Sequence, residues 1–277
     1  MVINTNMEAQ RTAGNLLASQ KSLQHSLARL SSGSKIANVA EDSAAVAITS
    51  RMESRLRRID AVTTGLSGII SLTQTQDGYI NSITDALTRM SELAVLSLDE
   101  TKSNADRQLY QKEFNVLNEA VATSSDKKFS GIDLFKTVSN GAYPTTVSVD
   151  ENASQFTILP VDLSGAVFTD AIKAPGAELS ISTSTAAKTT LDKVKNLLEH
   201  LQIERTGLGA IQSRVEFALS QLATSKENLS QAKSRISDVN IAQETTKYAR
   251  SQILVASGTQ MLREANDLPQ AALELLR

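Results

Sequence analysis

Apolar residues recur at seven-residue intervals along most of this 277-residue chain. The repeat is longest between residues 44 and 98 and between residues 187 and 236, and no proline interrupts either stretch. A seven-residue repeat of this length exceeds an ordinary globular helix and is typical of coiled-coil packing. We therefore predict two long helices, the first roughly 80 Å long at 1.5 Å per residue. Their predicted buried seam comprises Ile59, Leu66, Ile80, Leu87, Leu201, Leu208, Val215, Leu222, Leu229 and Ile236.

Two shorter helical repeats lie toward the ends of the chain. From Ala9 to Leu30 the apolar gaps alternate between four and three, with one polar break at Gln20. The repeat stops at residues 31–34, where Gly33 is suited to a helix C-cap. Because neither short helix has an apolar partner in its own half of the sequence, we expect the terminal segments to be largely disordered in the single chain and to fold, paired with each other, on assembly. The seam predicted for this inner pair comprises Leu16, Leu23, Leu27, Leu30, Ile241, Tyr248, Val255 and Leu262.

A region of different composition separates the two halves. After a break at residues 99–104, a medium helix is predicted by apolar positions at helical spacing, and the helical region ends near residue 128. Three of the four prolines fall between residues 129 and 186. Short alternating runs predict strands and turns at 145–150, 155–163 and 178–183.

The order of these elements predicts the fold class. Two long helices joined through an insert bury both seams only if they pack side by side and antiparallel, which also brings the terminal helices together. We expect a mainly α fold, an elongated antiparallel coiled-coil rod with paired terminal helices and a small β-rich insert at the distal end. The predicted parts are residues 1–43 (N-terminal helix and linker), 44–128 (N-terminal helices of the rod), 129–186 (insert), 187–236 (C-terminal helix of the rod) and 237–277 (C-terminal helix pairing with 1–32).

Composition narrows the classes of partner. The formal net charge of −2 gives no electrostatic reason to expect nucleic acid or an anionic membrane. No apolar run approaches the length of a membrane span, so no membrane insertion is expected. The N-terminus lacks a basic segment followed by an apolar core, so a cleaved signal peptide is not expected either. The chain contains no cysteine, which excludes disulfides and thiolate chemistry.

Candidate catalytic and metal-binding groups are sparse. The two histidines, His25 and His200, stand in separate helical segments without the spacing of metal ligands. The Glu41–Asp42 pair precedes a predicted helix, where carboxylates more often stabilise the helix dipole than act as acid and base. No nucleotide-binding or nucleophile motif is present. We therefore expect no enzyme activity, no cofactor and no metal.

Several motifs together resemble the bacterial flagellins over nearly the full chain. The N-terminal motifs include "LARLSSGSKI" (27–36), "EDSAAVAI" (41–48) and "FSGIDLF" (129–135). The C-terminal motifs include "NLSQAKSRISDVNIAQE" (228–244) and "ANDLPQAALELLR" (265–277). Each motif alone is moderately specific, and their order on both sides of a short insert makes the resemblance strong.

This resemblance implies a structural subunit that polymerises into the extracellular flagellar filament used for motility. The terminal helices would form an inner layer around a central channel, the long helices the next layer, and the insert would face outward. The implied partners are other copies of the chain, an export chaperone, a filament cap and hook-junction proteins. Export would run, without cleavage, through the flagellar secretion apparatus.

The resemblance also implies a surface for animal Toll-like receptor 5. By position, Arg89, Glu92, Leu93 and Glu113 match the family's receptor-contacting residues. Ser91 stands where well-recognised members carry a second arginine, which implies weakened recognition.

Two other functions are compatible with the helical repeats. A hook–filament junction protein shares terminal patterns with flagellins, although the C-terminal motif favours a flagellin. A cytoplasmic coiled-coil adaptor would show the same seams but would not need matching motifs at both ends.

Overall fold

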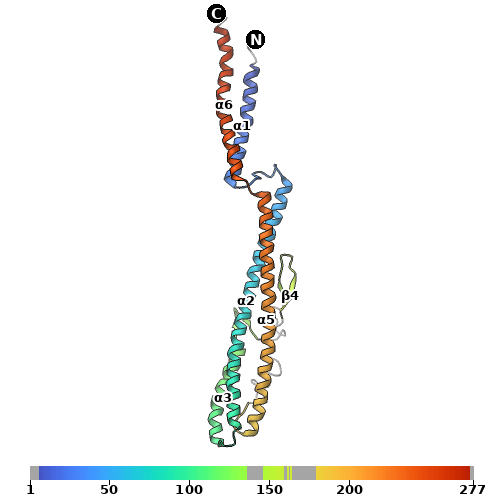
Figure 1. Cartoon of the computed structure of the whole chain (residues 1–277), viewed down its shortest axis with the longest axis vertical. Helices are drawn as coiled ribbons and strands as arrows, with labels where there is room; N and C mark the ends of the chain where they lie inside the picture. Colours follow the sequence, from blue (N-terminus) through green and yellow to red (C-terminus); the bar gives the residue numbers. More distant parts are fainter. Residues whose placement is uncertain (1–5, 136–145, 159–160, 162, 164–178, 275–277) are drawn as a thin grey trace. The chain divides into compact units, whose positions relative to one another are not determined.

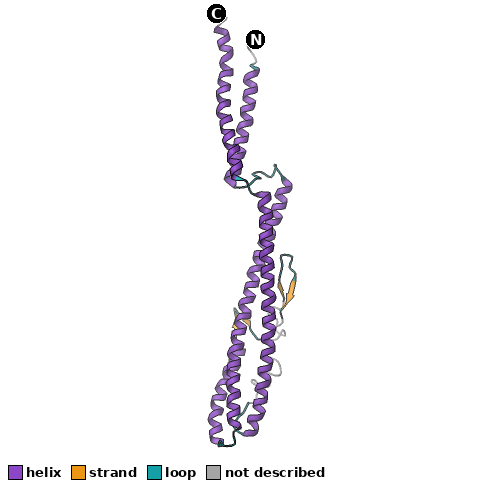
Figure 2. Ribbon diagram, viewed as in Figure 1, coloured by secondary structure: helices purple, strands orange, loops and turns teal. Residues whose placement is uncertain are grey.

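The computed structural model describes residues 6–135, 146–158, 161, 163 and 179–274, with side chains described as far as residue 267. Helices dominate this part of the chain, and the strands form two separate antiparallel pairs (Figures 1 and 2). The predicted mainly α fold with a small strand-containing insert is therefore confirmed. The elements are α1 (Met7–Ser32), α2 (Ser43–Leu98), α3 (Asn104–Ser125), β1 (Lys128–Phe129), β2 (Ile132–Asp133), β3 (Thr146–Ser148), β4 (Gln155–Thr157), α5 (Ser184–Ser237) and α6 (Ile241–Glu274).

The chain divides into two compact units, and both boundaries fall inside long helices. One unit combines the two ends of the chain, up to Leu56 and from Lys226, and contains α1 and α6. The other comprises Arg57–Ser225 and contains α3 and the strands. Each unit therefore includes a part of both α2 and α5.

The ends of the helices are set by local capping. The Asn6 side chain accepts a hydrogen bond from the Ala9 amide and so starts α1. Gly33 ends α1 in the left-handed conformation, with φ of 67°, which confirms the predicted C-cap. At the start of α2 the Ala45 amide donates to the Asp42 carboxylate (2.9 Å). The second carboxylate of the predicted pair, Glu41, has a different partner, described below.

The unit of residues 57–225 has its core between α2 and α5, which lie side by side and run antiparallel (Figure 1). An ion pair from Arg205 of α5 to Asp77 of α2 joins the two helices at 2.8 Å. The apolar positions repeated every seven residues are buried on both helices: Ile59, Leu66, Ile80, Leu87, Leu201, Leu208, Val215 and Leu222. Leu229 and Ile236, later in α5, belong to the other unit and are half-buried.

A tight turn reverses the chain between α2 and α3. Ser103 and Asp106 form a capping box at the start of α3. The buried Arg107 side chain donates to the carbonyl oxygens of Ser97 (2.8 Å) and Asp99 (3.0 Å). The Ser97 carbonyl lies in the last turn of α2, where no helical amide can satisfy it, so Arg107 caps α2 from the next helix.

The insert is anchored on the helices by single polar groups. The buried Gln76 amide of α2 donates to the Leu134 carbonyl just after β2 (2.7 Å). Arg214 of α5 lies over the ring of Phe156 in β4, 4.3 Å from its centroid.

The predicted strand at 178–183 is wrong for residues 179–183, which form no strand. The Ile181 amide donates instead to the side chain of Gln111 in α3, so a helix rather than a strand edge satisfies it.

Candidate assembly site

The terminal helices α1 and α6 pair with each other, so the chain folds its two ends together. Their contacts join residues more than two hundred positions apart in the sequence. Asn6 Nδ2 donates to the Ala265 carbonyl (2.6 Å), the hydroxyls of Ser22 and Ser251 lie 3.1 Å apart, and Ser26 Oγ donates to Glu244 (2.8 Å). The pairing expected from the sequence is present in the structure.

The α6 residues at these contacts are small or polar and recur every seven positions. They are Glu244, Ser251, Gly258 and Ala265, each three residues after one of the predicted apolar positions. At Gly258 a Cβ atom would lie 3.2 Å from Leu16 Cδ1, so the backbone of α6 approaches α1 closely there. Small residues of this kind let two helices pack at short range, and sequence reasoning that followed only the apolar repeat missed them.

The predicted inner seam occupies two different environments in the single chain. Six of its eight members are half-buried beside the contact: Leu16, Leu23, Leu30, Tyr248, Val255 and Leu262. Leu27 and Ile241 lie away from it and are 54% and 63% exposed. Ser26, one position before Leu27, takes the buried place instead.

Several large apolar side chains of the α1–α6 pair lie on the outside. Among its described residues, those that are fully buried are Ser26, Glu244, Ser251 and Ala265, and none is a large hydrophobic side chain. The exposed large side chains on these two helices are Met7, Leu17, Leu27, Ile241, Ile253, Leu254 and Met261. Contiguous exposed apolar surface marks a site of association with other protein surfaces.

The two connections of this unit are joined by their main chains. Ser34 and Asp238 form an antiparallel bridge, in which the Lys35 amide donates to the Ser237 carbonyl (2.7 Å) and the Val239 amide to the Gly33 carbonyl (3.1 Å). The Ser34 hydroxyl adds a contact to the Ser237 carbonyl at 3.2 Å. The motif "RLSSGSKI" therefore ends α1 and also pairs with the segment that precedes α6.

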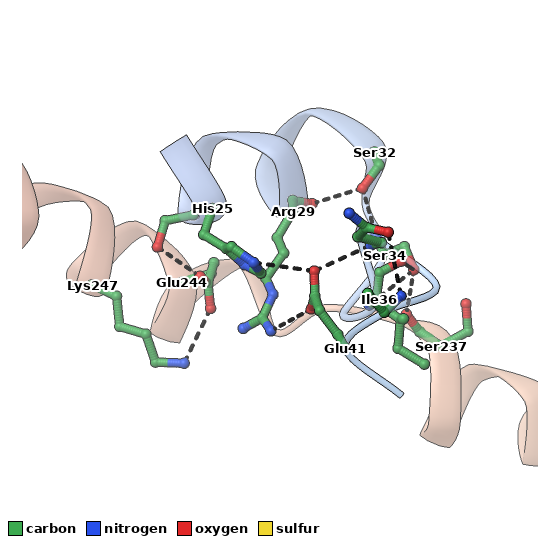
Figure 3. Close-up of polar contacts among 12 residues, drawn as sticks. His25, Arg29, Ser32, Ser34, Ile36, Glu41, Ser237, Glu244 and Lys247 are labelled. Carbon is green, nitrogen blue, oxygen red and sulfur yellow. Dashed lines mark hydrogen bonds and ion pairs between the residues drawn. The ribbon is translucent and has the colours of Figure 1, made fainter. Parts of the chain in front are cut away.

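Glu41 ties the connection after α1 back to α1. Figure 3 shows its carboxylate between the side chains of His25 and Arg29. His25 Nε2 lies 3.2 Å from one oxygen and Arg29 Nη2 2.9 Å from the other, and the Asn38 amide also donates to this carboxylate. The hydrogen bond from Arg29 is the main cause that lowers the pKa of Glu41 below its ordinary value.

Glu244 is a carboxylate inside the helix pair, with 3% of the residue exposed. It accepts from Ser26 of α1 (2.8 Å) and from Lys247 one turn later in α6 (3.1 Å) (Figure 3). Burial raises the pKa of Glu244, but the hydrogen bonds from Ser26 and Lys247 and the nearby positive charges outweigh it. The net result is a lowered pKa, so Glu244 is ionised at neutral pH.

The positions expected to contact an innate receptor are only partly on the surface. Arg89 of α2 donates to Glu113 of α3 (2.8 Å) and to Glu92 (2.9 Å), and all three side chains are exposed. These hydrogen bonds raise the pKa of Arg89, that from Glu113 most. Leu93 is 1% exposed because it faces the core, so it does not join this charged surface in the single chain.

Within the described residues, no group of three or more His, Asp or Glu side chains could hold a metal ion. None of the described helices combines the length and apolar character needed to cross a bilayer.

Comparisons with known proteins match both ends of the chain to the same family. Residues 3–140 match the bacterial flagellin N-terminal helical region, and residues 191–276 match the bacterial flagellin C-terminal helical region. A flagellin of Halalkalibacterium halodurans is 32% identical over 278 residues, and the match covers 100% of both chains. The flagellar filament 33 kDa core protein of Treponema phagedenis is also 32% identical, again over 100% of both chains.

A solved structure shares the fold at low sequence identity. It is assigned as a flagellar hook-associated protein of Vibrio parahaemolyticus, and the match covers 72% of this chain and 100% of that one. The TM-score is 0.59 and the identity 13%, so this likeness concerns the fold alone.

Proposed function

Because this chain belongs to the bacterial flagellin family, we infer that it is a structural subunit of the flagellar filament, in which copies of one chain polymerise. The observation that carries this function is the outward apolar surface of the α1–α6 pair. Burial of apolar surface between neighbouring copies supplies free energy at about 25 cal/mol per Å². No substrate or cofactor is needed for this process.

The arrangement of layers in the polymer is part of the proposal. The α1–α6 pair forms the inner layer around the central channel, and its exposed side chains, Leu27 and Ile241 among them, contact neighbouring copies. The long helices, predicted at residues 44–128 and 187–236, form the next layer. The insert at 129–186 faces outward. An interface of this kind joins unlike surfaces on successive copies, and such an interface extends into an open helical polymer.

Export and partners follow from the same function. The chain reaches the cell exterior uncleaved through the flagellar secretion apparatus. An export chaperone binds the apolar C-terminal segment before assembly, which prevents early association of surfaces such as Ile253 and Leu254. A cap at the growing tip and the hook-junction proteins are the remaining partners.

Electron microscopy of concentrated, purified protein tests this function. We expect long helical filaments from the chain alone, because one subunit carries both halves of every contact. A hook–filament junction protein would give no long filaments under the same conditions. A cytoplasmic adaptor would remain inside the cell, which fractionation of motile cells would reveal.

Recognition by Toll-like receptor 5 is a second, weaker role of the same chain. It rests on the exposed network of Arg89, Glu92 and Glu113. The serine at position 91, in place of a second arginine, is what weakens it. In reporter cells that express the receptor, we expect a weak response to the unaltered chain and a stronger one to Ser91→Arg. Gln108→Ala, on the exposed face of α3, is the matched control. An unchanged response to Ser91→Arg would count against this role.

A further inference from the structure

The methionines of this chain differ sharply in exposure. Of the four that the structure describes, Met90 is fully buried in α2 and Met52 is half-buried. Met7 and Met261 are 59% and 65% exposed. The two exposed methionines therefore both belong to the α1–α6 pair, one on each helix.

These two thioethers lie toward the same end of the pair. Asn6, which precedes Met7, donates to the carbonyl of Ala265 (2.6 Å). Ala265 follows Met261 by four residues, about one helical turn. Leu254, which is 50% exposed, precedes Met261 by seven residues and shares its face of α6. Met261 thus continues the exposed apolar surface on which the proposed polymerisation rests.

Methionine differs from its apolar neighbours on this surface in its chemistry. Among the described residues, the other exposed large apolar side chains of α1 and α6 are leucines and isoleucines, which carry no sulfur. Hydrogen peroxide transfers one oxygen atom to a methionine sulfur. The S–O bond forms as the O–O bond breaks, the sulfur loses two electrons, and the second peroxide oxygen leaves as water with both protons. The product is methionine sulfoxide.

This reaction changes the kind of surface that the helices present. A thioether packs as an apolar group, whereas a sulfoxide is polar. In the single chain, water solvates an exposed sulfoxide, so the fold is kept. Between copies the same oxygen would be buried without a donor, which costs free energy. Oxidation therefore opposes contact between copies without unfolding the chain.

We propose that Met7 and Met261 are peroxide-oxidation sites, and that their sulfoxides prevent polymerisation of the otherwise folded chain. The proposal rests on the proposed function, because it takes the outward surface of the α1–α6 pair as the contact between copies. It goes beyond that function by making assembly depend on the redox state of two side chains. The change is reversible, because methionine sulfoxide reductases restore the thioether.

Peroxide treatment of the full-length, unpolymerised chain tests these sites. After hydrogen peroxide is added and removed, peptide mass spectrometry measures the sulfoxide at each methionine. We expect Met7 and Met261 to be oxidised first and Met90 last, with an unchanged helical circular dichroism spectrum. The chain concentration needed for filaments, measured by pelleting, should rise at least about tenfold, equivalent to about 1.4 kcal/mol. Reductases specific for the two sulfoxide epimers should together return it to its original value.

Leucine at both positions should remove the sensitivity to peroxide. Met7→Leu/Met261→Leu keeps apolar side chains of similar volume, so this variant should form filaments equally well before and after treatment. The matched control, Met52→Leu, replaces a half-buried methionine of α2 and should remain as sensitive as the unaltered chain.

Peroxide added to finished filaments of the unaltered chain tests whether neighbouring copies cover the two sulfurs. We expect Met7 and Met261 to be oxidised more slowly in the filament than in the unpolymerised chain. Equal rates in both states would place these side chains outside the contact between copies and would overturn the proposal.

The proposal also fails if treated chains polymerise at the original concentration, or if Met7→Leu/Met261→Leu loses polymerisation as the unaltered chain does. Loss of the helical signal on oxidation would overturn it too, because unfolding would then explain the effect. None of these results touches the filament function, which the untreated chain tests by itself. Absence of filaments from the untreated chain would refute that function and, with it, this proposal.

Discussion

At the scale of single residues, two glycines of this chain face opposite environments. Gly258 lies against Leu16, whereas Gly68, in the middle of α2, has no atom within 4 Å of the place where a Cβ would stand. Glycine in a helix interior costs stability because the unfolded chain loses more freedom when it is ordered. At Gly258 the absence of a Cβ atom allows α6 to lie close to Leu16. At Gly68 no neighbouring atom of the single chain requires a glycine.

Gly68→Ala should therefore stabilise the unit of residues 57–225. We expect a gain of about 0.5–1 kcal/mol in the free energy of unfolding, measured by urea denaturation followed by circular dichroism. Gly258→Ala is the matched control, where the added methyl contacts Leu16 and offsets the gain in helix propensity. A loss of stability in Gly68→Ala would contradict the open environment of this position.

The carboxylates of Glu41 and Glu244 make the α1–α6 unit sensitive to acid. Both have a pKa lowered in the folded chain, so they contribute stability above the ordinary glutamate pKa of about 4.3, and this contribution is lost as the pH falls through the lowered values. We expect the melting temperature of this unit to fall as the pH is lowered from 5 towards 3, as followed by circular dichroism. Glu41→Gln/Glu244→Gln should show a flatter pH dependence, whereas Glu264→Gln, at an exposed position of α6, should behave like the unaltered chain.

At the scale of elements, the two kinds of helix pair differ in what they bury. The α2–α5 contact buries leucine, isoleucine and valine side chains at successive repeats, while the α1–α6 contact buries serine, glutamate and alanine. Local opening is easiest where few apolar contacts must be broken. The terminal helices of the single chain are therefore the less protected elements.

Hydrogen exchange of the unpolymerised chain should reveal this difference. Backbone amides of α1 and α6 should exchange faster than those between residues 59 and 94 of α2 or between 191 and 222 of α5. Polymerisation should slow exchange in α1 and α6 most, because neighbouring copies then cover their apolar surface. Equal protection of all helices in the single chain would argue against a polar contact between the ends.

The long helices could be predicted from sequence almost to the residue. The first was expected at 44–98 and is Ser43–Leu98, and the second was expected at 187–236 and is Ser184–Ser237. A repeat sustained over many turns outweighs exceptions at single positions. The pattern therefore predicts both that the segment is a helix and which of its faces is buried. The alternating run at 178–183 is short, and such a run predicts a strand only if another strand satisfies its main chain.

The contact between the ends was harder to predict in detail. The apolar repeat identified which helices pair, but Leu27 and Ile241 are exposed, and Ser26 and Glu244 lie at the contact. An apolar repeat shows which side chains are suited to burial without showing which surface buries them. Side chains suited to a neighbouring copy and side chains suited to the same chain look alike in one sequence.

At the scale of the whole molecule, polymerisation depends on apolar side chains that the single chain leaves uncovered. Ile253→Lys/Leu254→Lys places two charges on the exposed surface of α6. We expect the circular dichroism of this variant to stay helical and its filaments to be lost, because burying an unpaired charge costs several kcal/mol. Pelleting by ultracentrifugation with electron microscopy measures the loss.

Gln252→Lys, at an exposed polar position beside them, is the control and should still form filaments. Filaments of normal length from the double lysine variant would place the contact between copies on another surface.

The pairing of α1 with α6 can form only after most of the chain has been synthesised. Ser26 and Glu244 are separated by 218 positions, so a ribosome that adds about 5–20 residues per second makes them roughly 10–40 s apart. Throughout that interval α1 is present without its partner, and the bridge from Ser34 to Asp238 cannot form. A chain whose translation stops before α6 therefore lacks the contact between α1 and α6. The unit built from both ends of the chain can form only in chains that were translated past this point.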